Sequence, residues 1–583
     1  MEYLVFAAAL VLVLALLMLK GYMDHKRDEK RFIHKLYEEY GTLPKKEYKA
    51  DQFENISHYF RKHQEGFWVD DITWNDLNMD ELFKCMNYTW SAAGEEYLYY
   101  LLRKPSMNCG ELKEREKIIE YFRQNADQRV CFQFAFSKLG RCGKFSIYDY
   151  LDYLDNLGER SNLPHYLSLA LLLISVGILI GNIPVGLVVM VCILIYNNVT
   201  YFKVQKEIDP YITSFAYVFR LLEAADRLKN QSVPVLDEEL KRLRSCRNSM
   251  KLFKTGSYIV MSGARMTNTG GNPLDMLLDF VRMGFHLDLI KFNQMLSEVR
   301  KHINEIDEMI TTLGKIEAMI AIGEYREIHP HCIPEFVEQK EIEVKGLYHP
   351  LLLEPVANDI SIKNSALITG SNASGKSTFL KTVAINAILA QSVHTCLAES
   401  CRTSMFRVCS SMALRDDMQG GSSYYMVEIK ALKRILDLLN NREEIPVLCF
   451  VDEVLRGTNT VERIAASTEI LRSMAGQNCI CFAATHDIEL THLLEDVYQN
   501  YHFAEEIEDN DIFFSYKILD GRASTRNAIK LLGIMGYDDR IIKEAEEMAE
   551  AFLKTGHWNG IDLQKVKCYY NSINRKVGVQ WLI

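Results

Sequence analysis

A glycine-rich segment in the C-terminal third of the chain carries the clearest chemical signal. Residues 370–378 read G-S-N-A-S-G-K-S-T and match the pattern G-x-x-x-x-G-K-[ST]. The glycines let backbone N–H groups approach phosphate oxygens, and the N-terminus of a following helix adds a positive dipole end. In such a loop Lys376 reaches the β- and γ-phosphates of a nucleotide, and the Ser377 hydroxyl ligates Mg²⁺. The predicted phosphate-binding residues are Gly370, Gly375, Lys376, Ser377 and Thr378.

Two further apolar runs end in residues that could complete such a site. Residues 447–451 form a strand-like run that ends in Asp452 and Glu453. A carboxylate at a strand end is placed to hold Mg²⁺, and the next one can orient or deprotonate the attacking water. Residues 479–484 form another run, which is followed by Thr-His-Asp. His486 is predicted to contact the γ-phosphate or the water; the alternative is a helix-capping segment without a chemical role.

The elements around these residues fit a nucleotide-binding fold. The glycine-rich segment follows a short strand-like run, residues 366–369, and precedes a helical pattern that begins at Phe379. This strand–loop–helix order is the context that the motif requires. An Asp-Glu pair after an apolar run is a weak signal alone, but together with the loop it predicts an α/β domain that binds and hydrolyses a nucleoside triphosphate.

Four segments of this region resemble the MutS-type mismatch-repair ATPases. Residues 370–378 are similar to the family's phosphate loop, which carries Asn at the position of Asn372. Residues 452–460 are similar to its D-E-x-x-R-G-T-S-T segment, with Asn in place of Ser, and residues 484–490 to its A-T-H-x-x-E-L segment. Residues 416–428 resemble the signature segment G-x-S-T-F-M-V-E, with two tyrosines in place of Thr-Phe.

The resemblance implies a dimeric ATPase related to ABC cassettes, with ATP and Mg²⁺ as cofactors. Two nucleotides would be held between the ATPase domains of a homodimer, with Ser423 of one chain facing the γ-phosphate on the phosphate loop of the other. Asn372 would join the phosphate-binding residues, Glu453 would polarise water, and His486 would act as a switch histidine. The predicted ligands of Mg²⁺ are Ser377 and Asp452.

The likeness extends upstream into the family's helical core. It covers roughly residues 67–160 and 280–550 and is more specific in the ATPase than in the core. Because the core-like part begins near residue 67, the family's mismatch-recognition and connector domains are expected to be absent. Phe-x-Glu tripeptides at Phe336 and Phe503 resemble the family's mismatch wedge, but their place beside or inside the ATPase indicates chance matches.

Two apolar segments predict membrane helices. Residues 3–19 are uncharged and mostly aliphatic, and residues 161–202 contain no Asp, Glu, Lys or Arg. About 20 apolar residues cross about 30 Å of hydrocarbon, so the first segment fits one span and the second a hairpin turning at residues 181–184. A cleaved signal peptide and a buried core hairpin are the alternatives. Because basic residues follow the first run and do not precede it, residue 20 onward is predicted to lie in the cytoplasm.

The charge balance bears on the partner of the protein. The chain has 583 residues, 67 Lys and Arg against 77 Asp and Glu, and a net charge of −10. An acidic balance argues against a surface coated for nucleic acid, but not against a local patch. Residues 241–254 hold six basic residues and no acidic one. This segment could contact DNA phosphates, lie against anionic lipid, or form a solvated face.

The 14 scattered cysteines predict reduced thiols, and the alternate pair Cys479 and Cys481 predicts core packing.

The predicted fold is multidomain: an N-terminal transmembrane helix, an all-α core and lever region interrupted by a transmembrane hairpin, and a C-terminal α/β P-loop ATPase of ABC-like type. Such a chain is expected in the cell membrane as a multi-pass protein held by about three helices, with the core and ATPase in the cytoplasm. The predicted boundaries are 1–20 for the anchor, 21–160 for the first part of the core, 161–202 for the hairpin, 203–345 for the second part with the lever, 346–555 for the ATPase and 556–583 for the tail.

Three functional classes fit this organisation. The first is a membrane-anchored MutS-like ATPase that closes as an ATP-driven dimeric clamp on DNA. The second keeps the ATPase but acts on a membrane or protein partner without mismatch recognition. The third, an ABC-type transporter subunit, is disfavoured because three spans per chain are few and no polar or ionisable residue is expected inside the hairpin to mark a pathway. The family core favours DNA, whereas the acidic charge and the missing mismatch-reading domains favour the second class.

Overall fold

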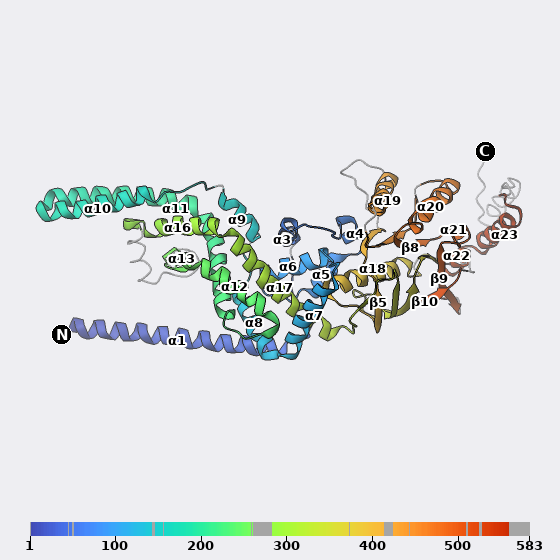
Figure 1. The fold of residues 1–583 in the computed structure, drawn as a ribbon, viewed down its shortest axis with the longest axis horizontal. Helices are drawn as coiled ribbons and strands as arrows, with labels where there is room; N and C mark the ends of the chain where they lie inside the picture. The colour runs from blue at the N-terminus through green and yellow to red at the C-terminus, as the bar shows by residue number, and fades with distance from the viewer. Residues whose placement is uncertain are drawn as a thin grey trace, which may run out of the picture.

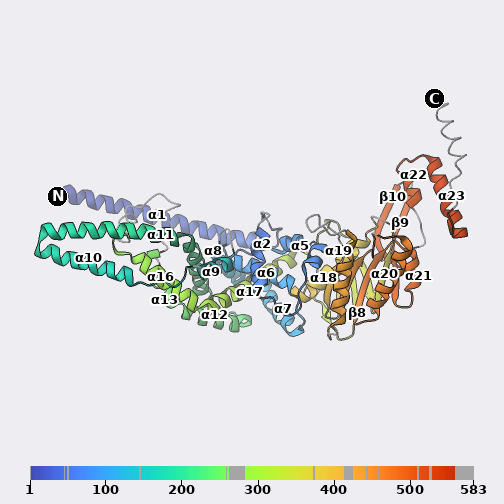
Figure 2. The ribbon, with the colours of Figure 1, turned by 90° about the horizontal axis from the view of Figure 1, so that it is seen from above.

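The chain folds into an elongated molecule with projecting helices at one end, a helical body in the middle and an α/β part at the other end (Figure 1). The computed structural model describes residues 2–44, 46–48, 52–142, 146–155, 157–257, 259–260, 283–371, 374–412, 424–441, 444–456, 458–508, 511–523 and 528–558. The segments that carry the membrane prediction and those that carry the nucleotide motifs therefore lie at opposite ends (Figure 2).

The helical body is built around the close crossing of α6 (Ala92–Arg103) and α17 (Ile303–Ile328). A Cβ on Gly314 of α17 would lie 2.5 Å from the carbonyl oxygen of Ala93, so only glycine allows the two backbones to approach this closely. The other helices of the body are α2 (Gln52–Ile56), α3 (His58–Lys62), α4 (Asp71–Asp76), α5 (Met79–Met86), α7 (Cys109–Gln124), α8 (Ala126–Leu139), α9 (Ile147–Asp155), α12 (Asp237–Ser249), α13 (Lys251–Lys254) and α16 (Leu287–Lys301).

Within the described residues, two helices are long and apolar enough to cross a membrane, α10 (Leu163–Gly181) and the first part of α11 (Ile183–Leu228). Their most apolar windows have mean hydropathies of 2.1 and 2.0. The chain turns between them at Asn182, as predicted, and the Asn182 side chain accepts a hydrogen bond from the Val185 N–H at 3.3 Å. Apolar side chains face outward, with Ile180 83% and Val199 66% exposed. A hairpin buried in the core would not expose them.

The interior of this hairpin is more polar than predicted. Asn197 of α11 is only 1% exposed, and its Oδ1 accepts a hydrogen bond from Ser168 Oγ of α10 at 2.5 Å. Its Nδ2 donates to the carbonyl oxygen of Gly284 at 3.0 Å, which ties the chain just before α16 to the hairpin. The expectation of no polar residue inside was wrong because an uncharged amide can be buried once its hydrogen bonds are made. Beyond the apolar part, α11 continues unbroken through the predicted boundary at residue 202.

The first helix, α1 (Glu2–Glu38), extends toward the same end of the molecule as the hairpin (Figures 1 and 2). Residues 3–19 form its first half, and their side chains, apart from Leu16 and Leu19, lie outside the described residues. Leu16 and Leu19 are 56% and 55% exposed. The membrane span expected over this segment is not one of the two candidate spans and stays a prediction.

The α/β part holds the three predicted strands side by side. A six-stranded sheet has the order β10-β9-β4-β8-β7-β6, in which β4 (Ser365–Thr369), β8 (Cys479–Thr485) and β7 (Val447–Asp452) are neighbours and parallel. Their carboxyl ends therefore meet at one edge, where open α/β sheets bind ligands. A four-stranded sheet has the order β1-β5-β2-β3.

The remaining elements of this part cover the two sheets and complete them. They are β1 (Glu335–Phe336), β2 (Ile342–Leu347), β3 (Asn358–Ile362), α18 (Lys376–Val393), β5 (Ser400–Thr403), β6 (Arg407–Ser411), α19 (Tyr424–Asn440), α20 (Thr460–Ala475), α21 (Ile488–Leu493), β9 (Tyr498–Glu508), β10 (Asp511–Asp520), α22 (Ala528–Ile534) and α23 (Asp539–Thr555).

Alternate residues of the central strands pack into two different cores. Phe450 and Phe482 belong to the large core that contains α18 and the helical body. Cys479 and Cys481 lie on the opposite face, in the core that contains α19 and α20, which confirms their predicted role in packing. Because side chains alternate across a strand, the long apolar runs supply both faces of a buried sheet.

Hydrogen bonds and an ion pair fix the helical body to the α/β part at two places. Arg326 of α17, whose side chain is fully buried, donates to the carbonyl oxygen of His394 at 2.9 Å, just after α18, and pairs with Glu116 at 2.8 Å. Asp76 of α4 accepts a hydrogen bond from Ser410 Oγ of β6 at 2.7 Å. The helix that follows the phosphate loop and the strand that leads toward the predicted signature segment are thus both fixed to the body.

A buried carboxyl of α17 gives this body a pH-dependent stability. Glu324 accepts a hydrogen bond from Gln133 Nε2 at 3.3 Å, and burial raises its pKa from 4.5 to about 7. A carboxyl with a raised folded-state pKa stabilises the fold fully below its unfolded pKa, and this stability is lost as the pH rises through the folded pKa. Glu324→Gln is therefore expected to change little near pH 4 and to raise stability by about 3 kcal/mol near pH 8, as measured by thermal unfolding. An equal change at both pH values would contradict the raised pKa.

Candidate functional site

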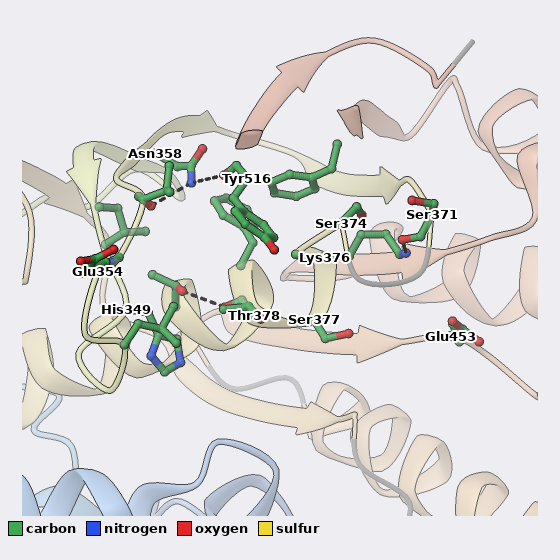
Figure 3. A pocket seen from close by; sticks show the side chains of 18 of the residues that line it. His349, Glu354, Asn358, Ser371, Ser374, Lys376, Ser377, Thr378, Glu453 and Tyr516 are labelled. Carbon is green, nitrogen blue, oxygen red and sulfur yellow. Dashed lines mark hydrogen bonds between the residues drawn. The ribbon is translucent and has the colours of Figure 1, made fainter. Parts of the chain in front are cut away.

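The glycine-rich segment forms the loop between β4 and α18 (Figure 3). Gly375 has φ of 103°, a conformation that L side chains rarely adopt, and a Cβ on Gly370 would lie 2.8 Å from Ser374 Oγ. Both glycines are therefore required by the backbone. Ser374 Oγ is buried and has no hydrogen-bond partner among the described residues, so it can serve a phosphate oxygen. Asn372 lies outside the described residues, and its predicted role stays a prediction.

Lys376 is buried at the first position of α18, directly under the loop. Its Nζ donates to the carbonyl oxygens of Gly370 and Ser371, both at 2.8 Å, and lies 3.4 Å from His486 Nε2. Burial lowers the pKa of this ammonium group. The two carbonyl oxygens are weak partners for a cation compared with phosphate, so the ammonium is positioned to exchange them for a nucleotide.

Glu453 and His486 follow the adjacent parallel strands β7 and β8, and the structure brings them into contact. The Glu453 N–H donates to the carbonyl oxygen of Ala484 at 2.9 Å, which holds the two strand ends together. Glu453 Oε1 lies 2.8 Å from His486 Nε2, and Oε2 lies 2.5 Å from Arg456 Nε. Burial acts to raise the pKa of Glu453, but the hydrogen bond with His486 and the charge of Arg456 outweigh it, so the pKa is lowered. This carboxylate is therefore ionised.

The residues predicted to hold Mg²⁺ have suitable donor atoms. Asp452 is 7% exposed, and its Oδ1 accepts no hydrogen bond from any residue in the described part of the chain. Arg456 NH2 lies 3.9 Å from this oxygen, beyond hydrogen-bond range. Ser377 lines the same cavity as Lys376. A free carboxylate oxygen and a hydroxyl are the hard oxygen ligands that Mg²⁺ prefers, so the donor set fits this cation.

A cavity of about 670 Å³ lies over the phosphate loop, and Ser377 and Thr378 contribute to its floor (Figure 3). Asn358 of β3 fixes its far wall, because its Nδ2 donates to the carbonyl oxygen of Tyr516 at 3.0 Å. The wall is mostly apolar and includes aromatic rings, as in sites that bind a flat ring. The wall residues that the sequence did not reveal are Leu352, Leu353, Val356, Phe503 and Tyr516.

Other predicted residues lie beside or beyond this cavity. Ser423 directly precedes α19 and lies outside the described residues, so its role across a dimer stays a prediction. Asn459 directly precedes α20 as its N-cap, and its side chain accepts a hydrogen bond from the Glu462 N–H at 3.0 Å. Arg463 in the first turn of α20 pairs with Asp487 at 2.7 Å, which ties α20 to the chain after β8. The family-like segment after β7 thus starts a capped helix next to the site.

The basic residues of segment 241–254 are largely paired within the chain. This segment forms α12 and α13, and Arg247 Nε and Lys254 Nζ each lie 2.5 Å from the carboxylate of Asp226 on α11. Hydrogen bonds from these cations hold the pKa of Asp226 well below its usual range, although burial acts in the opposite direction. Lys241 pairs with Glu238 at 2.9 Å. Of the three alternatives for this segment, the ion pairs favour a solvated face.

Comparison with known proteins matches the part of the chain that carries the site. Residues 366–553 match the family model described as MutS domain V. The protein named DNA mismatch repair protein MutS is 32% identical over 273 residues in Thermotoga maritima, and these cover 45% of this chain and 34% of the relative. The proteins of that name in Thermus thermophilus and Lactobacillus delbrueckii subsp. bulgaricus are each 28% identical, over 265 and 287 residues. The C-terminal part of the chain is thus similar to domain V of MutS.

The MutS match spans β4 through most of α23, and so includes the phosphate loop and the ends of β7 and β8. The chain covers about a third of the length of these MutS relatives, 34%, 32% and 33% of the three proteins. The likeness therefore bears on the ATPase domain of MutS. The two candidate membrane helices lie upstream of the segment that the domain V model matches.

Proposed function

We propose that this chain is a MutS-like, Mg²⁺-dependent ATPase that is anchored in a membrane and works as a homodimer. The observation that carries the proposal is the convergence of Lys376, Glu453 and His486 at one edge of the sheet. Lys376 Nζ lies 3.4 Å from His486 Nε2, which in turn lies 2.8 Å from Glu453 Oε1. A cation for the phosphates and a carboxylate that can orient or deprotonate water are groups that nucleotide hydrolysis uses, and the histidine lies within reach of both.

Each of these side chains has a separate role in the proposed reaction. Lys376 leaves the two loop carbonyls and pairs with the β- and γ-phosphates, so that charge developing on the transferred group is stabilised. Glu453, which its lowered pKa keeps ionised, orients the attacking water and accepts its proton as the water attacks. His486 donates to the γ-phosphate or the water. Because it also contacts Glu453, binding of the γ-phosphate would change the contact between His486 and Glu453. Ser377 and Asp452 would hold Mg²⁺, which neutralises phosphate charge when bound.

A second copy of the chain is the proposed partner of the ATPase domain. In the proposed dimer, Ser423 of a second chain would face the γ-phosphate on the phosphate loop of the first. Large apolar side chains are exposed where α22 and α23 project from the α/β part, as Met535 at 76% and Ile541 at 51% illustrate (Figure 2). Val461 at the start of α20 is 79% exposed. Exposed apolar side chains of this kind mark association surfaces.

The anchoring is proposed from the hairpin and from α1. The hairpin helices α10 and α11 expose their apolar side chains, and water would oppose an exposed apolar surface of this length. The hairpin returns the chain to the side from which it came, so the body and the ATPase stay together on the cytoplasmic side. About three helices, α1 and the two of the hairpin, would hold the chain in the cell membrane.

DNA is the first candidate for the substrate of the proposed clamp, because the similar proteins are named for DNA mismatch repair. A membrane or protein partner without mismatch recognition is the second candidate. The net charge of −10 and the ion-paired state of segment 241–254 favour the second. Both candidates keep the ATPase, and they differ in the partner on which ATP hydrolysis acts: DNA in the first, a membrane or another protein in the second.

One preparation tests these proposals together. The full chain is purified in detergent from membranes washed with alkaline carbonate, which removes peripheral proteins. Retention in the washed membranes and Mg²⁺-dependent hydrolysis of ATP are the expected results, and their absence contradicts the anchor and the ATPase respectively. DNA retention is then measured at low and high salt, with and without ATP, since phosphate contacts weaken steeply with salt. Salt-sensitive retention supports the DNA clamp, and no retention at low salt excludes it.

A further inference from the structure

The turn that carries the proposed base is strained. Glu453 and Leu455 have φ of 57° and 58°, and both lie in the left-handed region that residues other than glycine rarely enter. Such residues persist only where the surrounding structure fixes them. The question is therefore which contacts hold this turn, since they also determine where the Glu453 carboxylate points.

A carboxylate from α19 holds the turn from outside. Glu428 Oε1 accepts a hydrogen bond from the Leu455 N–H, and the Arg456 N–H also contributes to holding this carboxylate. Glu428 is 2% exposed, and burial raises its pKa, so holding the ionised carboxylate at this place costs folding free energy that its hydrogen bonds have to offset. Its other oxygen, Oε2, has no hydrogen-bond partner within the described ranges. The buried carboxylate thus accepts hydrogen bonds from two successive backbone N–H groups of the strained turn, those of Leu455 and Arg456.

The same turn orients the base directly. Arg456, whose N–H faces Glu428, sends its guanidinium back to Glu453 Oε2 at 2.5 Å. The Ser467 hydroxyl of α20 also donates to the carbonyl oxygen of Val454 at 3.2 Å, so this contact holds a carbonyl of the turn, whereas Glu428 holds its amides. Glu428 is therefore the carboxylate that holds the amide side of the backbone between the base and the arginine that pairs with it.

Helix α19 also connects Glu428 to the helical body. Arg434, six residues further along this helix, pairs with Asp70 beside α4 and donates to the carbonyl oxygen of Ser410 near the end of β6. The first turn of α19 directly follows the segment that contains Ser423. A shift of α19, whether from the helical body or from its own N-terminus, would reach the strained turn through Glu428.

We infer that Glu428 is a positioning residue that couples the placement of α19 to the orientation of Glu453, so that hydrolysis on one chain depends on what engages the start of its α19. The inference rests on the proposed ATPase function and adds to it a route by which the helical body and a second subunit regulate the base. Glu428 itself touches neither the cavity over the phosphate loop nor Lys376. It acts through the backbone of residues 453–456.

Steady-state ATP hydrolysis by the full chain tests this coupling. Glu428→Ala removes the acceptor, and Glu428→Asp keeps the charge but is too short to reach the Leu455 N–H. Both are expected to lower kcat by about tenfold to a hundredfold with KM for ATP changed by less than about threefold, because the base is misplaced while the nucleotide site is intact. Glu428→Gln retains an acceptor at Oε1 and is expected to recover most of the wild-type kcat.

The matched control is Asp437→Ala, which removes an exposed carboxylate from the same helix, where it pairs with Lys433. Wild-type kcat is expected for this control. Wild-type kcat in Glu428→Asp overturns the inference, as does an equal loss in Glu428→Gln and Glu428→Asp, even where Glu428→Ala fails to fold. A wild-type chain without any hydrolysis contradicts the proposed function itself, and is thereby distinct from failure of the inference alone.

Discussion

Lys376→Ala is expected to abolish ATP hydrolysis and to weaken ATP binding. The side chain is 5% exposed, and its ammonium group is held at 2.8 Å from two loop carbonyls, at the place where the phosphates are predicted to lie. Alanine leaves the loop without a cation to meet the β- and γ-phosphates. Loss of a preorganised charge contact of this kind lowers kcat by about a hundredfold to a thousandfold. Hydrolysis is measured by phosphate release, and binding by titration with a fluorescent ATP analogue.

Lys381→Ala is the matched control for this variant. Lys381 lies on the same helix, α18, but is not among the residues that line the cavity. Its removal tests whether loss of any lysine from α18 disturbs the domain. Near-wild-type hydrolysis is expected for the control. Wild-type hydrolysis by Lys376→Ala itself would refute the assignment of the phosphate loop.

The phosphate loop could be predicted because its parts are consecutive in the chain. A short apolar strand, a glycine-rich turn and a helix that starts with Lys376 follow one another, and the structure has them as β4, the loop and α18. The runs that became β7 and β8 were recognisable for a related reason, since strands buried on both faces are continuously apolar. Elements that follow one another directly, and strands that are buried on both faces, can therefore be recognised from the sequence alone.

The contacts of Glu453 could not be read from the sequence in the same way. Its pairing with His486 requires that β7 and β8 be neighbours in the sheet, which depends on the order of all six strands. Its pairing with Arg456 requires two left-handed residues, and neither Glu nor Leu signals such a conformation. Tyr516 reaches the cavity from β10, at the edge of the sheet, without a pattern of its own.

The hairpin of α10 and α11 shows that composition predicts apolar helices but not which of their side chains are buried. The absence of charge in residues 161–202 indicated two long apolar helices, and the structure has them. It could not indicate which side chains face inward, because helix rotation is set by contacts with the rest of the fold. Asn197 is buried because Ser168 and Gly284 satisfy its amide, and both contacts are long-range. Polar residues in such helices have to be judged by their partners.

Glu453→Gln is expected to separate ATP binding from hydrolysis. Glutamine has nearly the same shape, its amide oxygen can still accept from Arg456, and its NH2 can donate to His486 Nε2 of a neutral ring, so the turn and the cavity remain in place. It cannot accept a proton from the attacking water, and loss of a general base costs about a hundredfold to ten-thousandfold in rate. Phosphate release should therefore fall to near background while the affinity for ATP stays close to wild type.

The assembly state makes this prediction sharper. If ATP holds two ATPase domains together and hydrolysis releases them, Glu453→Gln should accumulate as an ATP-bound dimer, whereas Lys376→Ala should not. Light scattering coupled to gel filtration in detergent measures this, with Glu469→Gln on exposed α20 as the isosteric control. Wild-type turnover by Glu453→Gln would remove Glu453 from the role of base. Weakened ATP binding in that variant would instead show that Glu453 holds the nucleotide, because a base acts on the water and contributes little to the affinity of the ground state.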